Sequence, residues 1–215
     1  MGIALKTALF LPLLALFLPL TGCESAPSKL RSQGLNLYDQ GNYSGAADKF
    51  EAALRYDESE PKANYYAGAA DFKLGHYSEA AYHYKLAWQH DPSNGDMKEG
   101  LAESLIKTDK KDEAMDFLER DAALTNKPAD RIRVAEMYEK LGDLDNAELN
   151  YRKAAAMPPP NVDTQVKMGQ FYERIGKKDL AAQAFKSAYK LDPTKPGLPE
   201  MLSRNGVGMA DVVGR

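Results

Sequence analysis

Small, hydrophobic and polar positions recur at a fixed spacing along most of this chain. A turn residue appears five times, at Gly41, Gly75, Asp109, Gly142 and Gly176, in steps of 34, 34, 33 and 34 residues. Five residues after each turn residue there is an alanine, and nine residues after it an aromatic residue or leucine. Because self-similarity at such a period is typical of helical repeat arrays, the phase predicts five repeats, at 27–60, 61–94, 95–127, 128–161 and 162–195.

Each repeat is expected to form two antiparallel helices around its turn. Two helices approach closely only where side chains are small, and an aromatic residue then fills the groove between repeats. The small positions of the first helices are Gly34, Gly68, Ala102, Ala135 and Gly169; those of the second are Ala46, Ala80, Ala114, Ala147 and Ala181; the fillers are Phe50, Tyr84, Leu118, Tyr151 and Phe185. Glycine at the turn suits the left-handed residue that ends a helix. A generic helical bundle with chance periodicity is the alternative, and five copies in phase argue against it.

These positions resemble the tetratricopeptide repeat (TPR) family over residues 29–195. The resemblance implies an all-α fold, a right-handed α-solenoid of about five helix-turn-helix repeats. Solenoids need a terminal element that covers the last apolar face. We expect residues 198–205, which include Leu202, to provide it within a C-terminal cap and tail at 196–215.

Repeat three departs from the pattern in two places. Asp109 stands where the other repeats have glycine, and Asp121 stands where they have alanine, twelve residues after the turn. We therefore expect the second helix of this repeat to be shifted, frayed or exposed.

The first 22 residues differ from the rest and are expected to be a removed signal peptide. Lys6 is their only charge, and the apolar stretch that follows from Thr7 to Leu20 contains Pro12 and Pro19. A membrane-spanning helix needs roughly 20 apolar residues, so we favour a secretory signal over a transmembrane anchor.

The signal sequence ends in Leu20-Thr21-Gly22-Cys23, which resembles a bacterial lipobox. Cys23 is the only cysteine, so an exported form of the chain has no intramolecular disulfide partner for it. The resemblance implies that Cys23 is lipidated, and several acyl chains anchor a protein stably. A free cysteine after an ordinary cleavage site is the alternative. We expect residues 23–28 to form a short tether. By the same resemblance, Glu24 implies that the protein is lipid-anchored to the periplasmic face of the outer membrane.

Composition and motifs argue against other functions. A formal charge of −3 leaves no broad basic surface for nucleic acid. The chain has no phosphate-binding glycine loop and no nucleophile elbow. His76, His83 and His90 are spaced by seven residues, roughly 10 Å of helical rise, too far for two of them to share one ion. We predict no catalytic site, metal or cofactor.

In TPR arrays the first helices line a concave groove that holds peptides or helices. By that resemblance the predicted partner-binding groove consists of Arg31, Leu35, Tyr38, Tyr65, Phe72, Lys73, Glu99, Glu103, Ile106, Glu136, Glu139 and Glu173, with Asp39, Ala69, Lys107, Ile132, Lys140, Val166, Gln170 and Arg174 at the equivalent remaining positions. The first half is aromatic and apolar, as interface anchors are. The second half is acidic and would steer a basic partner. Each half has an alternative interpretation. The aromatic residues could fill contacts between repeats, and the acidic residues could form a solvated face.

One family subtype is disfavoured. Its members clamp a C-terminal carboxylate with a lysine and an asparagine, where this chain has Arg31 and Leu35, and leucine cannot donate a hydrogen bond. The architecture resembles pilotins and tight-adherence pilus assembly lipoproteins. We therefore predict a membrane-anchored protein-interaction scaffold of the bacterial cell envelope, an assembly factor for a pilus or secretion complex. The alternative is a regulatory adaptor that docks peptidoglycan hydrolases or proteases.

Overall fold

The computed structural model describes residues 25–212 and is built of helices. The predicted signal peptide, Cys23 and Glu24 lie outside the described residues, as do residues 213–215. The helices are α1 (Ala26–Asp39), α2 (Tyr43–Leu54), α3 (Pro61–Leu74), α4 (Tyr77–His90), α5 (Gly95–Lys107), α6 (Lys111–Thr125), α7 (Pro128–Lys140), α8 (Leu144–Ala156), α9 (Val162–Arg174), α10 (Lys178–Leu191) and α11 (Leu198–Arg204), followed by the 3₁₀ turn Met209–Asp211. The predicted all-α solenoid is confirmed.

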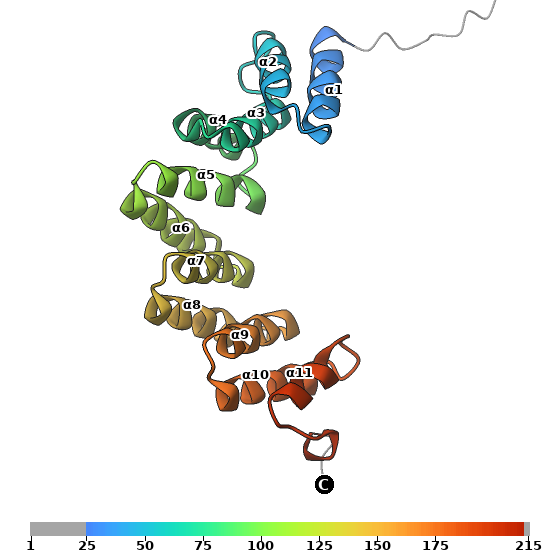
Figure 1. The fold of residues 1–215 in the computed structure, drawn as a ribbon. Coiled ribbons are helices and arrows are strands. Elements are labelled where there is room, and N and C mark those ends of the chain that lie inside the picture. Colours follow the sequence, from blue (N-terminus) through green and yellow to red (C-terminus); the bar gives the residue numbers. More distant parts are fainter. Residues whose placement is uncertain (1–24, 213–215) are drawn as a thin grey trace, which may run out of the picture.

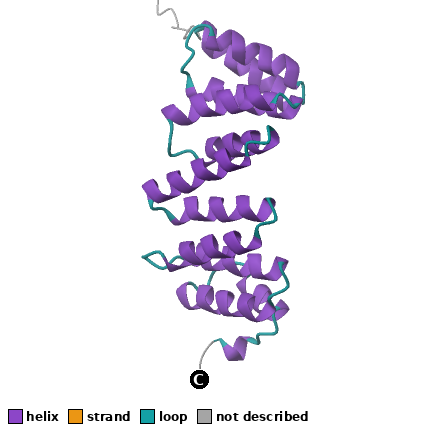
Figure 2. Cartoon of the chain, turned by 90° about the vertical axis from the view of Figure 1, so that its left-hand side faces the viewer, coloured by secondary structure: helices purple, strands orange, loops and turns teal. Residues whose placement is uncertain are grey.

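The helices stack one after another into an elongated array (Figure 1). Each odd-numbered helix from α1 to α9 packs against the even-numbered helix that follows it, and against its neighbours in the array. The stack bows, because α5 and α6 lie to one side of both ends in Figure 1. Figure 2, turned by 90°, shows the same succession of layers. The first helices of successive repeats therefore present one continuous surface and the second helices another.

The turn inside each repeat is left-handed in all five copies. The four turn glycines have φ between 76° and 83°, and Asp109 adopts φ 62° at the same place. Aspartate enters this region more readily than most residues with a Cβ. The backbone closes in the same way around it, since the Lys110 N–H donates to the Leu105 carbonyl at 2.9 Å, as Asp143 N–H does to Tyr138.

Repeat three keeps the register of the other repeats. Its second helix, α6, is a continuous helix of 15 residues, and Ala114 and Leu118 are buried as their counterparts are. Asp121 is also buried, and its carboxylate is 2.5 Å from the ammonium of Lys98. The expectation of a frayed or exposed helix was therefore wrong, because a buried lysine from α5 provides a partner for the aspartate.

The close approach of paired helices depends on glycine opposite an aromatic ring. A Cβ added at Gly34 would lie 2.7 Å from Cε1 of Phe50, and one at Gly169 would lie 2.5 Å from Cε1 of Phe185. Both rings are fully buried. Such distances leave no room for a methyl group in a densely packed interior.

The last repeat is covered by α11. Leu198 and Leu202 are fully buried, and Val207 joins the same hydrophobic cluster. Ordered structure continues beyond the expected cap through the 3₁₀ turn to Val212. Within residues 25–212, no helix combines the length and hydrophobicity needed to cross a membrane.

Candidate partner-binding groove

Most of the predicted groove residues lie on the first helices, and ion pairs link them from one repeat to the next. Lys140 of α7 contacts Glu99 and Glu103 of α5, and Arg174 of α9 contacts Glu139 of α7. Contacts between side chains 35 to 41 residues apart are possible only if α5, α7 and α9 lie side by side. These helices thus form one surface, which we call the first-helix groove.

Four tyrosines cluster in the first two repeats, three of them on the first helices α1 and α3 and Tyr84 on α4. The ring centroids of Tyr38 and Tyr66 are 6.2 Å apart, those of Tyr65 and Tyr66 5.0 Å, and those of Tyr65 and Tyr84 5.9 Å, all edge to face. Such pairs favour a rigid aromatic surface. We call Tyr38, Tyr65, Tyr66 and Tyr84 the tyrosine cluster; it joins α1, α3 and α4.

The tyrosine cluster offers hydrogen-bond donors to a ligand. Burial is the main cause that raises the pKa of Tyr38, Tyr65 and Tyr84, so these hydroxyls stay protonated at neutral pH. The carboxylate of Asp96 also raises the pKa of Tyr65 and Tyr84. Within residues 25–212 these three hydroxyls have no hydrogen-bond partner. Tyr38 and Tyr65 are partly exposed and can donate to a carbonyl or carboxylate, whereas Tyr84 is buried.

The other predicted residues of the first half are engaged in different ways. Phe72 packs edge-on against Tyr77 with centroids 5.3 Å apart, and the Lys107 ammonium lies 6.0 Å from the centre of the Tyr77 ring. Arg31 is held by Glu60 at 3.2 Å. Leu35 is partly buried and packs against the hydrophobic cluster around Phe50, whereas Lys73 is exposed.

The second half of the groove is not a free acidic surface. Lys140 lies 2.7 Å from Glu99 and 2.5 Å from Glu103, and Lys167 lies 2.7 Å from Glu136. Each of these acids therefore has a cation from the next repeat, which offsets the charge expected to steer a basic partner.

The pairing continues to the end of the array. Arg174 donates twice to Glu139, at 2.6 and 2.8 Å, and this contact lowers the pKa of Glu139. Glu173 accepts from Arg204 at 3.3 Å and from Asn205 at 2.7 Å. Arg204 and Lys167 stand outside the positions used to predict the groove, so the sequence pattern missed them. Ile106 is partly buried against the central hydrophobic cluster.

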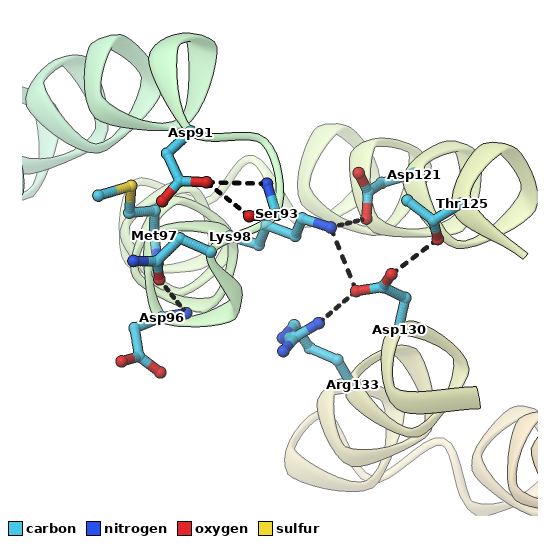
Figure 3. Close-up of polar contacts among 10 residues, drawn as sticks. Asp91, Ser93, Asp96, Met97, Lys98, Asp121, Thr125, Asp130 and Arg133 are labelled. Carbon is cyan, nitrogen blue, oxygen red and sulfur yellow. Dashed lines mark hydrogen bonds and ion pairs between the residues drawn. The ribbon is translucent and has the colours of Figure 1, made fainter. Parts of the chain in front are cut away.

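A buried charge network joins repeats three and four (Figure 3). The Lys98 ammonium, 1% exposed, lies 2.5 Å from Asp121 and 3.1 Å from Asp130. Asp130 also accepts from Thr125 at 2.7 Å and from Arg133 at 2.6 Å. Figure 3 shows the lysine reaching from α5 toward α6 and α7. Because every charge has partners, the network holds α5, α6 and α7 together.

The histidines have separate environments. His83 is buried, with Nδ1 3.1 Å from the Asn64 side-chain oxygen and Nε2 2.8 Å from Glu51, whereas His76 and His90 are exposed. In the part of the chain that the structure describes, no group of three or more His, Cys, Asp or Glu side chains is placed to hold a metal.

The fold and the groove define a helical-repeat binding protein, and comparison with known proteins gives its family. A tetratricopeptide repeat model matches residues 31–94 and 135–196, and a second matches residues 71–141. The chain belongs to the tetratricopeptide repeat family. Proteins of this family mediate protein–protein interactions.

Solved structures share the fold at low identity. The MamA protein aligns with a TM-score of 0.53 and 20% identity over 86% of this chain and 97% of its own. A thermophilic TPR protein of Thermus thermophilus aligns with a TM-score of 0.51 and 21% identity, over 84% of this chain and 98% of its own. These likenesses concern the fold.

The curated relatives are much longer proteins. Anaphase-promoting complex subunit 3 of Schizosaccharomyces pombe is 27% identical over 70% of this chain, and the CTR9 homolog of Arabidopsis thaliana is 32% identical over 33% of it. The chain spans 23% and 7% of their lengths, respectively.

Proposed function

We propose that this protein is a non-catalytic scaffold that holds a segment of a partner protein in the first-helix groove, against the tyrosine cluster. The observation that carries the proposal is the contrast within the groove. The carboxylates of repeats three to five are paired with neighbouring cations, whereas the partly exposed Tyr38 and Tyr65 carry hydroxyl donors on a cluster of aromatic rings. Tyrosines of this kind are frequent interface anchors.

The proposal includes a lipid anchor at Cys23 and a location on the periplasmic face of the outer membrane. A lipobox-like Leu20-Thr21-Gly22-Cys23 and the single thiol support it. The partner is then a component of the envelope, and we favour an assembly factor for a pilus or secretion complex. A chain labelled with a clickable palmitate analogue should carry the label, and Cys23→Ser should lose it and leave the membrane fraction.

The groove is tested by affinity capture with the full chain. Tyr65→Ala should remove the captured partner, while Tyr56→Ala, which truncates a 65% exposed tyrosine outside the groove, should retain it. Thermal unfolding of both variants shows whether each is folded. Capture that is unchanged in a folded Tyr65→Ala variant would contradict the groove assignment. Pilus or secretin subunits among the captured proteins support the assembly role, and peptidoglycan hydrolases or proteases contradict it in favour of an adaptor.

A further inference from the structure

A second groove, on the opposite helices, lies between repeats four and five. Its walls are α8 and α10, its floor is α9, and its volume is about 550 Å³. Ala155, Met168, Leu180 and Ala184 give it an apolar lining, and Arg152 lies on its rim. Its lining includes none of the residues predicted for the first-helix groove. We call it the second-helix groove of repeats four and five.

Equivalent grooves at two earlier junctions are narrowed by the chain's own side chains. At the junction of repeats two and three, Trp88 lies thirteen residues after the turn residue of repeat two, and Phe117 lies eight residues after that of repeat three. Their rings meet edge-on with centroids 5.0 Å apart. About 320 Å³ remains there. Between repeats one and two the same positions hold Leu54 and His83, His83 is 2.8 Å from Glu51, and about 160 Å³ remains.

The junction of repeats three and four is closed by polar contacts. Its two positions hold Ala122 and Asn150, and the Asn150 amide donates to Glu119 at 3.5 Å and accepts from Arg131 at 3.4 Å. Three of the four junctions therefore use the residue eight after the turn to close the groove.

The junction of repeats four and five has no such closing residue. The two positions hold Ala155 and Ala184, which have no atoms beyond Cβ to fill the space. Glu51 and Glu119 each lie ten residues after a turn residue. They contact the closing residues of the following repeats, His83 and Asn150 respectively. Arg152 occupies that position here, and Ala184 offers it no polar atom.

The charge of Arg152 acts through space on Tyr172 and on Glu148, where it favours a lowered pKa. Arg152 itself has no ion pair or hydrogen bond to any residue in the described part of the chain. The nearby Glu148 is already held by Lys177 at 2.8 Å and by the Tyr172 hydroxyl at 3.1 Å. The groove thus combines an apolar lining with Glu148, which is already held by Lys177, and with Arg152, a cation that makes no ion pair or hydrogen bond within residues 25–212.

We propose that the second-helix groove of repeats four and five binds a partner segment that inserts an aromatic side chain beside an aspartate or glutamate. The aromatic ring takes the place that Trp88 and Phe117 fill at the earlier junction, and burying it removes apolar area from water. The neighbouring carboxylate pairs with Arg152, which favours bidentate contact with a planar acid. The site is separate from the first-helix groove, so a chain that uses both holds two segments at once.

The test uses the full chain and two blocked peptides that carry photoreactive benzoylphenylalanine, one with a flanking glutamate and one with a flanking lysine. Irradiation followed by mass spectrometry should place the glutamate peptide on α8, α9 or α10, with labelling several-fold above that of the lysine peptide. Arg152→Glu should reverse this preference. Lys85→Glu, the equivalent change at the filled groove of repeats two and three, is the matched control and should leave both peptides unchanged.

A second variant probes the space itself. Ala184→Phe supplies the ring that Phe117 provides elsewhere and should abolish labelling, with circular dichroism confirming the helical fold. Equal labelling by both peptides, labelling confined to the first-helix groove, or an Arg152→Glu variant with unchanged preference would each overturn the proposal. So would a dimer in sedimentation that Ala184→Phe converts to monomer, because a second copy would then occupy the groove. Tyr65→Ala should not affect labelling, which separates this test from that of the proposed function.

Discussion

The junction of repeats one and two and the junction of repeats three and four follow from the same repeat spacing but are held together by different chemistry. The first packs mainly through Phe50, Tyr66 and several buried alanines, with the two rings stacked 5.7 Å apart, and its buried His83 contacts Glu51 at one side. The second contains Lys98 between Asp121 and Asp130. One repeat spacing therefore tolerates either an apolar interior or a buried ionic one.

The two junctions should respond differently to substitution. Hydrophobic contact has no direction, so an apolar interface loses stability in proportion to the contact removed. A buried charge network depends on every member, since removing one partner leaves another charge buried and uncompensated. The difference predicts graded effects in repeats one and two and an abrupt effect at repeats three and four.

The largest effect is expected from Lys98→Ala. The change leaves Asp121 buried without its cation, and breaking a buried pair in this way typically costs about 3–5 kcal/mol. The free energy of unfolding, measured by urea titration of the full chain, should fall by this order. A loss below about 1 kcal/mol, typical of exposed pairs, would contradict the proposed role of the network.

A double variant sharpens that result. Lys98→Met with Asp121→Ala replaces the pair by apolar residues and restores the alanine found at the same position of the other repeats. Replacing both partners is often neutral or stabilising. Most of the stability lost in Lys98→Ala should therefore return.

A smaller effect is expected from Gly34→Ala in repeat one, next to the apolar junction. The new methyl group would meet the Phe50 ring, and overpacking of this kind costs typically about 1–3 kcal/mol. The midpoint of urea unfolding should decrease accordingly. Adding Phe50→Leu should relieve the clash and recover part of the loss; no recovery would show that the ring is not the cause.

The pH dependence should have opposite signs at the two places. Burial opposes ionisation of Asp130, but Thr125, Lys98 and Arg133 together lower its pKa, so its contribution is present above the unfolded value and is lost as the pH falls through the folded pKa. Burial raises the pKa of Asp71 in repeat two, so its contribution is present below the unfolded value and is lost as the pH rises through the folded pKa.

Replacing these acids with their amides separates the two contributions. Asp130→Asn should flatten the rise of stability between about pH 3 and pH 7, and Asp71→Asn should steepen it. Urea midpoints measured across that range provide the check. Slopes that change in the same direction for both variants would contradict the assignment.

The smallest effect is expected at the exposed ion pairs of the first-helix groove. Lys140→Ala removes contacts to Glu99 and Glu103, but all three side chains are at least 32% exposed, and such pairs contribute about 0–1 kcal/mol. The loss should shrink further in high salt, because mobile ions screen surface charges. A salt-independent loss would show that the pair is shielded from solvent.

The sequence alone determined the repeat architecture. The recurrence of a turn residue, an alanine and an aromatic residue reports contacts within a repeat and between neighbours, and these contacts are local along the chain. The same spacing marked Gly34 and Gly169 as small positions and Phe50 and Phe185 as groove fillers, and the structure adds that each ring packs against the glycine of its own repeat. The anchor at Cys23 stays a prediction.

Only the tertiary structure decided the chemistry of the surfaces and of the third repeat. Asp121 looked misplaced because Lys98, its partner, lies 23 residues away and on another helix. Glu99 looked free because Lys140 is 41 residues away. Periodicity records which positions face a neighbouring helix, but not which side chains meet there. That pairing depends on the stacking of the repeats in space, which brings distant charges within contact and leaves Ala155 and Ala184 facing an open groove.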